Sequence, residues 1–269
     1  MNYQVDIMIV GDSKSGHEIL DKIATSKPTI KMAFISKAFK SSTTHDYLNV
    51  EYFRNEVEFT DYKNRLFCCY LKDGKRIYAT HLIIATGLAY EPLMLGTEAV
   101  TTGVYHSADE VVKNAKNLPA VVICDDNSDV KLVLDVAKKY KQVYVCTKEA
   151  KIKYLTAVST KKLAKAENVV LLPNTSIVKA VYQDNILQKV ELDNYSELNC
   201  AAIYAQTHSR PDTDFVSDKL INKTDTGHLA IDNKAESVLV PKCFAVGSCA
   251  EKYTKQKAQA MVEAILSNF

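Results

Sequence analysis

Residues 122–134, VICDDNSDVKLVL, combine an apolar strand, a polar turn and an amphipathic helix, the layout of a unit that binds phosphate at the turn. Such a turn carries glycines because the backbone must turn tightly and approach a pyrophosphate closely. Here Cys124, Asp125 and Asp126 stand in their place, so two carboxylates would meet phosphate with like charge. The pattern predicts that the strand, turn and helix are retained and that the turn no longer binds phosphate. We expect the two aspartates to N-cap the helix, because adjacent carboxylates without further ligands make a poor cation site.

A second turn of this kind stands near the N-terminus, in DIMIVGDSKSG (6–16). Gly11 and Gly16 occupy the first and third glycine positions of the fingerprint, and Ser13 occupies the middle one. The Cβ of a serine crowds the backbone where a pyrophosphate would pass. The motif G-x-S-x-x-G is weak evidence for a nucleotide site by itself.

The seven cysteines predict neither a disulfide framework nor a zinc site, because their number is odd and no C-x-x-C occurs. We expect buried thiols in a reducing compartment, no metal site and no catalytic triad. Cys249 could be a reactive thiol at the start of the last helix, although a packed cysteine is the favoured interpretation. For His106, a loop histidine is favoured over a catalytic one. The catalytic residues stay unassigned.

Composition excludes several classes of function. A net charge of +2 gives no electrostatic case for binding nucleic acid or an anionic membrane. No apolar run approaches the roughly 20 residues of a membrane span, and an early first strand leaves no room for a signal peptide. We therefore expect a cytoplasmic protein.

Strands alternating with helices predict an α/β fold of two Rossmann-like three-layer domains, the second inserted into the first. The expected boundaries give a first domain of residues 1–108 and 228–269 and a second of residues 109–227. Residues 50–84 predict a small antiparallel meander, and Asp184-Asn185 predicts a hairpin turn. The last helix carries an apolar stripe formed by Ala258, Met261, Val262 and Ile265.

Several spaced motifs together resemble the low-molecular-weight thioredoxin reductases and the related thioredoxin-reductase-like ferredoxin–NADP reductases. They are DIMIVGDSKSG, THLIIATG (80–87), VICDDNSDVKLVL, RPDT (210–213) and VPKCFAVGSCAEKYTKQKAQA (240–260). The resemblance implies an FAD domain split around an inserted NADPH domain, and a homodimer. The FAD-binding residues that it implies are Gly11, Ser13, Gly16, Thr86, Gly87, Gly247, Ser248 and Gln256.

Two sites of that family are missing from this sequence. The chain has no glycine between Gly103 and Gly227, and only Lys148 remains of the basic motif that holds the 2′-phosphate of NADPH. We therefore expect no ordinary NADPH binding. Where thioredoxin reductases carry their C-x-x-C, the chain reads GVYHSADE (103–110), which excludes thioredoxin reduction by the usual dithiol mechanism.

The FAD site is less decided. The ribose carboxylate expected after the second strand is replaced by Ser36-Lys37, and the closing Gly-Asp pair by Gly247-Ser248. Lys255-Gln256 keep the character of the family's Arg-Gln pair. The segment 37–50 is short where relatives wrap the flavin ring. FAD binding therefore stays open on the sequence alone.

Two functions remain in competition. The first is a non-catalytic or cofactor-poor descendant that binds a protein partner, a small nucleotide or its own copy. The alternative is an FAD-binding oxidoreductase that takes electrons from a donor other than NADPH.

Overall fold

Two crossings of the chain divide the protein into two units. The computed structural model describes residues 2–37, 47–108 and 118–269. Unit 1 contains the chain up to Ala89 and Ser209–Phe269, and unit 2 contains Tyr90–His208. Both divisions lie earlier in the chain than the expected 108/109 and 227/228. The reason is packing: Leu95 and Val100 belong to a core cluster of unit 2, and Val216 and Leu220 to one of unit 1.

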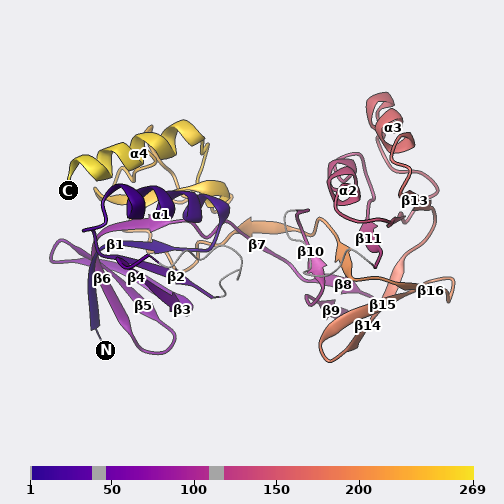
Figure 1. Cartoon of the computed structure of the whole chain (residues 1–269), viewed down its shortest axis with the longest axis horizontal. Helices are drawn as coiled ribbons and strands as arrows, with labels where there is room; N and C mark the ends of the chain where they lie inside the picture. The colour runs from indigo at the N-terminus through magenta and orange to yellow at the C-terminus, as the bar shows by residue number, and fades with distance from the viewer. Residues whose placement is uncertain (1, 38–46, 109–117) are drawn as a thin grey trace. The chain divides into compact units, whose positions relative to one another are not determined.

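The sheet of unit 1 has seven strands, in the order β3-β2-β1-β6-β5-β4 with β19 beside β6 (Figure 1). The part formed by β3, β2, β1, β6 and β19 is parallel, whereas β4, β5 and β6 are antiparallel. The long strand β6 joins these two parts. Its strands are β1 (Asn2–Val10), β2 (Met32–Ser36), β3 (Val50–Arg54), β4 (Val57–Lys63), β5 (Leu66–Leu71), β6 (Arg76–Ile84) and β19 (Cys243–Ala245).

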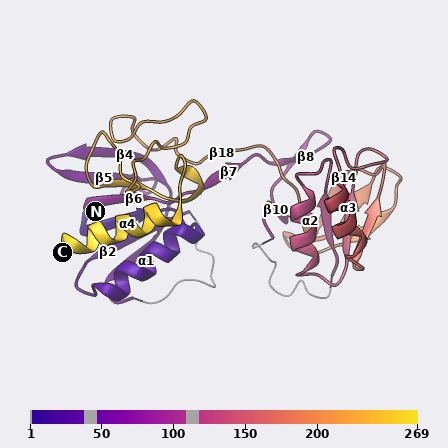
Figure 2. The same ribbon diagram turned by 90° about the horizontal axis from the view of Figure 1, so that it is seen from above.

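Two helices, α1 (Lys14–Ser26) and α4 (Lys255–Ser267), cover one face of this sheet (Figures 1 and 2). Side chains alternate along β1, so Ile7 and Ile9 pack under the helices while Met8 and Val10 enter the core of the other face. A strand buried on both faces explains the uninterrupted apolar run in the sequence. The predicted stripe of α4 is confirmed, since its buried residues are Ala258, Met261, Val262 and Ile265.

The predicted meander over residues 50–84 is partly wrong. Its first run forms two strands, because β3 pairs in parallel with β2 while β4 pairs with β5 on the opposite edge. The chain leaves β3 at Asn55, whose backbone N–H donates to the carbonyl oxygens of Ser36 and Phe53. Only β4, β5 and β6 therefore form the antiparallel part.

Unit 2 stacks three layers around a parallel sheet of the order β10-β17-β11-β12-β13. Two helices pack on one face and the antiparallel sheet β14-β15-β16 on the other (Figure 1). The parallel strands are β10 (Val104–Tyr105), β11 (Ala120–Ile123), β12 (Val143–Cys146), β13 (Val169–Leu172) and β17 (Ala202–Tyr204). The other elements are α2 (Val130–Ala137), α3 (Ala157–Ala164), β14 (Ile177–Gln183), β15 (Ile186–Leu192) and β16 (Glu197–Asn199).

The hairpin predicted at Asp184-Asn185 is confirmed. Both residues have positive φ, of 51° and 61°, between β14 and β15. Short two-stranded pairs complete the molecule: β7 (Leu88–Tyr90) with β18 (Ser209–Pro211), and β8 (Leu93–Leu95) with β9 (Glu98–Val100). The α/β fold class predicted from the sequence is confirmed.

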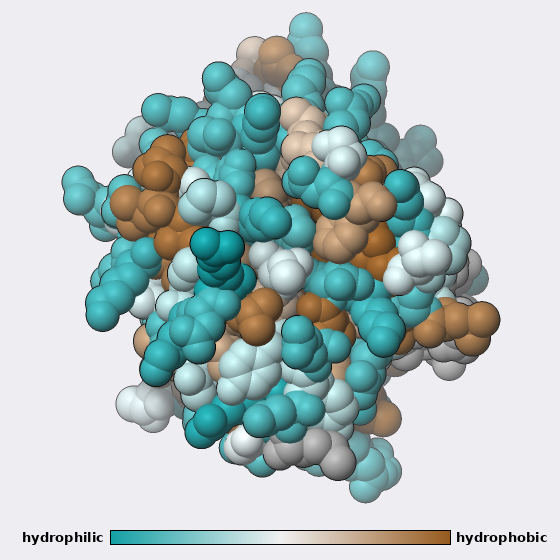
Figure 3. Space-filling view, turned by 90° about the vertical axis from the view of Figure 1, so that its left-hand side faces the viewer, coloured by the Kyte–Doolittle hydropathy of each residue, from teal (hydrophilic) through white to brown (hydrophobic). Residues whose placement is uncertain are grey.

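No helix among the described residues is long and apolar enough to span a membrane. Over the same residues, no three His, Cys, Asp or Glu side chains are placed to hold a metal ion. On the face of unit 1 shown in Figure 3, apolar side chains lie in separate patches among hydrophilic ones.

Candidate functional site

Most of the residues predicted to hold FAD gather where β1, β6 and β19 end. A methyl group added to Gly87 would lie 3.7 Å from Ser248 Oγ and 3.9 Å from Ser13 Cβ. A methyl group added to Gly247 would lie 3.8 Å from Ser13 Oγ. Gly11, Gly87 and Gly247 all have positive φ, of 110°, 75° and 78°. Small residues from three separate segments therefore meet at this edge of the sheet.

Gly11 and Gly16 are required by the protein's own backbone. A Cβ on Gly11 would lie 2.4 Å from the carbonyl carbon of Ala85, and one on Gly16 would lie 2.8 Å from the Gly11 oxygen. Gly11 also continues the sheet, since its N–H donates to Ile35 O at 2.9 Å. The survival of these two glycines is explained by packing, with or without a nucleotide.

Ser13, in place of the middle glycine, is the N-cap of α1. Its Oγ accepts a hydrogen bond from the backbone N–H of Gly16 at 3.2 Å. One of the helix amides that a phosphate could use is therefore taken by a side chain.

Gln256 stands apart from this group, whereas Thr86 belongs to it through its backbone, since a Cβ added to Gly11 would lie 2.4 Å from Thr86 N. Thr86 Oγ1 donates to Asp212 O at 2.6 Å, which ties the end of β6 to the segment after β18. Gln256 is exposed in the first turn of α4, and no hydrogen bond among the described residues joins its side chain to the glycines. The structure thus brings seven of the eight predicted residues into one region.

The position expected to bind the ribose carries a cation. Lys37 Nζ lies 3.3 Å from Glu56 Oε1 and 3.5 Å from Asp212 Oδ2. Although burial opposes it, the charges of Asp212 and Glu56 raise the pKa of Lys37. Most of the shortened segment 37–50 lies outside the described residues.

The cysteines are enclosed in the protein and form no disulfides. All seven are buried and free. Burial raises the pKa of Cys124, Cys146 and Cys200 to about 12, and it also raises the pKa of the other four. Because the thiolate is the nucleophile, such thiols are inert at neutral pH.

Cys249 is a packed cysteine, as favoured from the sequence. It does not begin the last helix but lies in a 3₁₀ turn, η2 (Gly247–Cys249), ahead of α4. Its Sγ donates to Val246 O at 3.2 Å, and burial raises its pKa.

His106 is held within unit 2. Its ring stacks on that of Tyr90 with centroids 4.0 Å apart, and its Nδ1 lies 2.8 Å from Ala205 O. These contacts agree with the favoured interpretation of a structural loop histidine.

The turn between β11 and α2 is closed by its own carboxylates. Asp129 Oδ2 accepts hydrogen bonds from the backbone N–H groups of Asp125 and Asp126, at 3.0 Å and 3.3 Å. Asp126 Oδ1 accepts from the Ser128 N–H at 2.6 Å. The prediction that Asp125 and Asp126 N-cap the helix is wrong, because the N-cap residue is Asp129 and its side chain reaches back into the turn.

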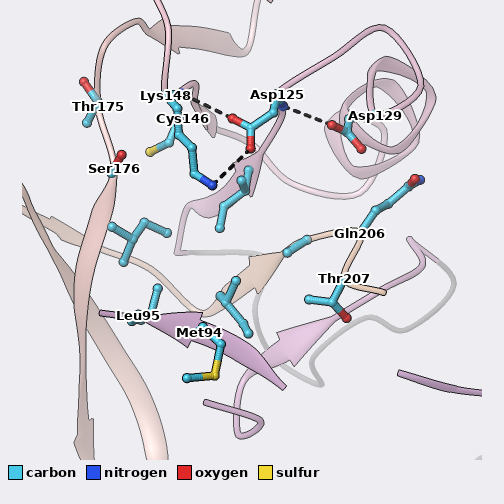
Figure 4. Close-up of a pocket in the computed structure, with 14 residues that line it drawn as sticks. Met94, Leu95, Asp125, Asp129, Cys146, Lys148, Thr175, Ser176, Gln206 and Thr207 are labelled. Carbon is cyan, nitrogen blue, oxygen red and sulfur yellow. Dashed lines mark hydrogen bonds and ion pairs between the residues drawn. The ribbon is translucent and has the colours of Figure 1, made fainter. Parts of the chain in front are cut away.

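Lys148 completes this arrangement. Its backbone N–H donates to Asp125 Oδ1 at 3.3 Å, and its Nζ lies 3.6 Å from Asp125 Oδ2 (Figure 4). The cation that remains from the 2′-phosphate motif is therefore paired with a carboxylate that replaces a glycine.

A cavity of about 190 Å³ opens beside this turn (Figure 4). It lies at the carboxyl ends of β11, β12 and β17. The chain leaves β11 toward β12 on one side and returns to β17 on the other, and such switch points are where open α/β sheets bind ligands. Its polar lining comes from Asp125, Asp129, Lys148, Thr175, Ser176, Gln206 and Thr207, and its apolar lining from Leu93, Met94, Leu95, Ile123, Cys146, Ile177 and Ala205.

Sequence reasoning missed Asp129 and the contacts of Lys37. Asp129 follows Asp126 at the spacing typical of capping side chains, so a local signal existed. Glu56 and Asp212 are distant from Lys37 in the chain, so no local sequence pattern predicts that they contact it.

Comparison with known proteins assigns the chain to a family. The profile of the family described as "Pyridine nucleotide-disulphide oxidoreductase" matches residues 17–247. The chain belongs to this family. No curated protein sequence matches it.

Several solved structures with the same fold are thioredoxin reductases. That of T. acidophilum is 18% identical with a TM-score of 0.62, covering 98% of this chain and 97% of its own. That of Streptococcus pyogenes is 17% identical with a TM-score of 0.62, covering 100% of both chains. That of Giardia duodenalis is 18% identical with a TM-score of 0.59, covering 98% of this chain and 97% of its own. The chain thus shares the fold of these thioredoxin reductases.

Proposed function

We propose that this chain is a non-catalytic member of its family that binds no NADPH in unit 2. The carboxylate of Asp129 supports this most directly. It accepts hydrogen bonds from the backbone amides of Asp125 and Asp126. A pyrophosphate at this turn would need both of these donors.

The charges of the turn act in the same direction. Asp125, Asp126 and Asp129 carry like charge to a phosphate, while the cation of Lys148 is already paired and largely exposed, at 72%. A dinucleotide would have to displace internal hydrogen bonds and approach three carboxylates. The residues present do not fit NADPH.

The thiols support the same proposal. Dithiol chemistry needs a thiolate at the surface, and all seven cysteines are buried with raised pKa values. Seven unpaired thiols also support our inference of a cytoplasmic location, where cysteines stay reduced.

An activity assay tests the proposal. The protein is incubated with excess FAD, and NADPH oxidation is followed with ferricyanide and with an aromatic disulfide as acceptors. We expect rates at the level of free FAD, while a thioredoxin reductase with an intact C-x-x-C serves as the positive control. NADPH oxidation that depends on the protein would overturn the proposal.

One observation favours the alternative, an FAD-binding oxidoreductase with another donor. Gly87 and Gly247 adopt left-handed backbone conformations at one edge of the sheet, beside Ser13 and the exposed Ser248. These residues would line the dinucleotide, and FAD would supply electron transfer that the side chains cannot.

A flavin-retention experiment separates the two candidates. The protein is mixed with FAD and desalted, and its absorption spectrum is recorded. Gly87→Ala is the informative variant, because its added Cβ meets only ordinary contacts, of 3.7 Å or more. Gly74→Ala, with a similar φ of 80° and open space around it, is the matched control. Flavin retained by the wild type and lost only in Gly87→Ala would establish FAD binding at this edge, which the alternative requires.

A further inference from the structure

We propose that the cavity of unit 2 binds a small organic cation: an ammonium group attached to about one ring of hydrocarbon, with no phosphate. This rests on the proposed function, because the cavity adjoins the turn from which phosphate is excluded. The organic cation would bind beside the modified turn in place of a nucleotide.

The size of the cavity sets the size of the ligand. Its volume is about 190 Å³. A dry cavity of about 150 Å³ can hold benzene, whereas pockets for drug-sized molecules start near 300 Å³. A whole dinucleotide is too large, and a single ring with one substituent fits.

One wall accepts hydrocarbon. Leu95, Cys146 and Ile177 are buried and come from three elements that converge on the cavity. Met94 and Leu95 lie on the opposite side from Asp125 in Figure 4, so a ring on this wall would direct its substituent toward the carboxylates.

The other wall favours positive charge. The side chains of Asp125, Asp129 and Lys148 line it, which leaves one negative charge among the ionised groups that line the cavity. Lys148 is 72% exposed and lies 3.6 Å from Asp125 Oδ2, so its ammonium can move outward and be replaced by that of a ligand. Burial raises the pKa of Asp129 despite the two amide hydrogen bonds, which indicates a carboxylate whose charge is not fully compensated.

Neutral polar groups would complete the recognition. Thr175 Oγ1 donates to Pro173 O, so its lone pairs can accept a hydrogen bond from an ammonium. Ser176 and Gln206 also line the cavity and supply a hydroxyl and an amide. An ammonium group has three donors, and the carboxylates and hydroxyls of this wall are acceptors for them.

Three probes of one shape test the charge preference. Benzylamine, benzyl alcohol and benzoate are each titrated into the full-length protein labelled with ¹⁵N, and the amide shifts of Asp125, Asp126, Lys148 and Ser176 are followed by NMR. We expect saturable shifts with benzylamine, binding at least about tenfold weaker for benzyl alcohol, and none with benzoate, since one lost charge-assisted hydrogen bond accounts for about that factor.

Two variants make the test specific. Asp125→Asn keeps the shape of the side chain and an acceptor for the Lys148 amide. It should weaken the binding of benzylamine about tenfold. Asp135→Asn removes an exposed carboxylate of α2 that lies outside the cavity lining, and it should leave the affinity unchanged. Three outcomes would overturn the proposal. They are benzoate that binds as tightly as benzylamine, no saturable shift with benzylamine, and equal effects of the two variants. NADPH added to the same sample tests the proposed function separately, because nucleotide binding would be seen whether or not the amine binds.

Discussion

Two turns of the molecule begin from the same frame of strand, turn and helix and differ in what fills them. The turn after β1 keeps Gly11 and Gly16, and the turn after β11 contains Asp125, Asp126 and Asp129 instead. In the first, Ser13 caps the helix that follows it; in the second, Asp129 caps amides that precede the helix. Each turn has satisfied backbone amides with its own side chains.

The difference shows which glycines a nucleotide fold needs for itself. Gly11 stays where backbone touches backbone, with a prospective Cβ 2.4 Å from Ala85. Where only a phosphate required the space, side chains could enter once phosphate no longer bound, because a glycine without such a role costs conformational entropy. A surviving glycine is thus poor evidence for a cofactor unless its contacts leave room for one.

The largest loss of stability is expected from a substitution in the first turn. Gly11→Ala places a Cβ against backbone atoms at a φ of 110°, so we expect a loss of about 3 to 5 kcal/mol in the free energy of unfolding. Gly74→Ala, at a φ of 80° with nothing within 4 Å, should lose only about 1 kcal/mol. Urea denaturation of both variants measures this, and equal losses would contradict the packing explanation.

Acid should act in opposite directions on two groups, His81 in unit 1 and Asp129 in unit 2. Burial, with a contribution from Lys242, lowers the pKa of His81 in β6 from 6.5 to about 4. Protonation is therefore disfavoured in the folded state, and unit 1 should lose about 3 kcal/mol as the pH falls from 6.5 to 4. In unit 2, the raised pKa of Asp129 has the opposite sign, since protonation there favours the fold as the pH falls toward 3.8.

Hydrogen exchange resolved by peptide measures the two units separately over this pH range. His81→Asn should remove most of the acid sensitivity of unit 1 and leave unit 2 unchanged. An unchanged pH profile of unit 1 in this variant would show that another group is responsible.

A smaller effect concerns the second turn. Asp129→Ala leaves two amides of the turn without their acceptor, and we expect a loss of about 1 to 3 kcal/mol. Asp129→Asn keeps an acceptor and should lose less. Asp135→Ala, which removes an exposed ion pair with Lys138, is the control on the same helix and should stay within about 0.5 kcal/mol. Thermal denaturation of the three variants ranks them, and an alanine variant at position 129 as stable as the control would argue against a closed turn.

The smallest effect is expected at Lys37. The Lys37 side chain is 58% exposed, so Lys37→Gln should change the free energy of unfolding by no more than about 1 kcal/mol. Raising the salt concentration should reduce even this difference. A larger, salt-independent loss in urea denaturation would indicate a structural role that the ion pairs do not describe.

Much of the fold could be predicted because its signals are local. The apolar run of β1, the stripe of α4 and the left-handed turn at Asp184-Asn185 each lie within a few residues. The assignment of β3 failed because β3 and β4 are separated only by Asn55 and Glu56, and the choice of partner strand depends on the whole sheet.

The candidate site was less predictable for a related reason. The sequence shows that carboxylates replaced the glycines after β11, but not that Asp129 would reach back to the amides of Asp125 and Asp126. It also gives no sign that Lys37 meets Glu56 and Asp212, which are brought to it by the fold of the sheet.

The most direct test of the account is an NADPH titration observed at the second turn. Full-length protein labelled with ¹⁵N is titrated with NADPH up to about 1 mM, a concentration that detects binding of roughly −4 kcal/mol or stronger. We predict no saturable shift of the Asp125 and Asp126 amides, because both already donate hydrogen bonds to the carboxylate of Asp129. Saturable shifts of these two amides would show that the turn still receives phosphate and would contradict the account.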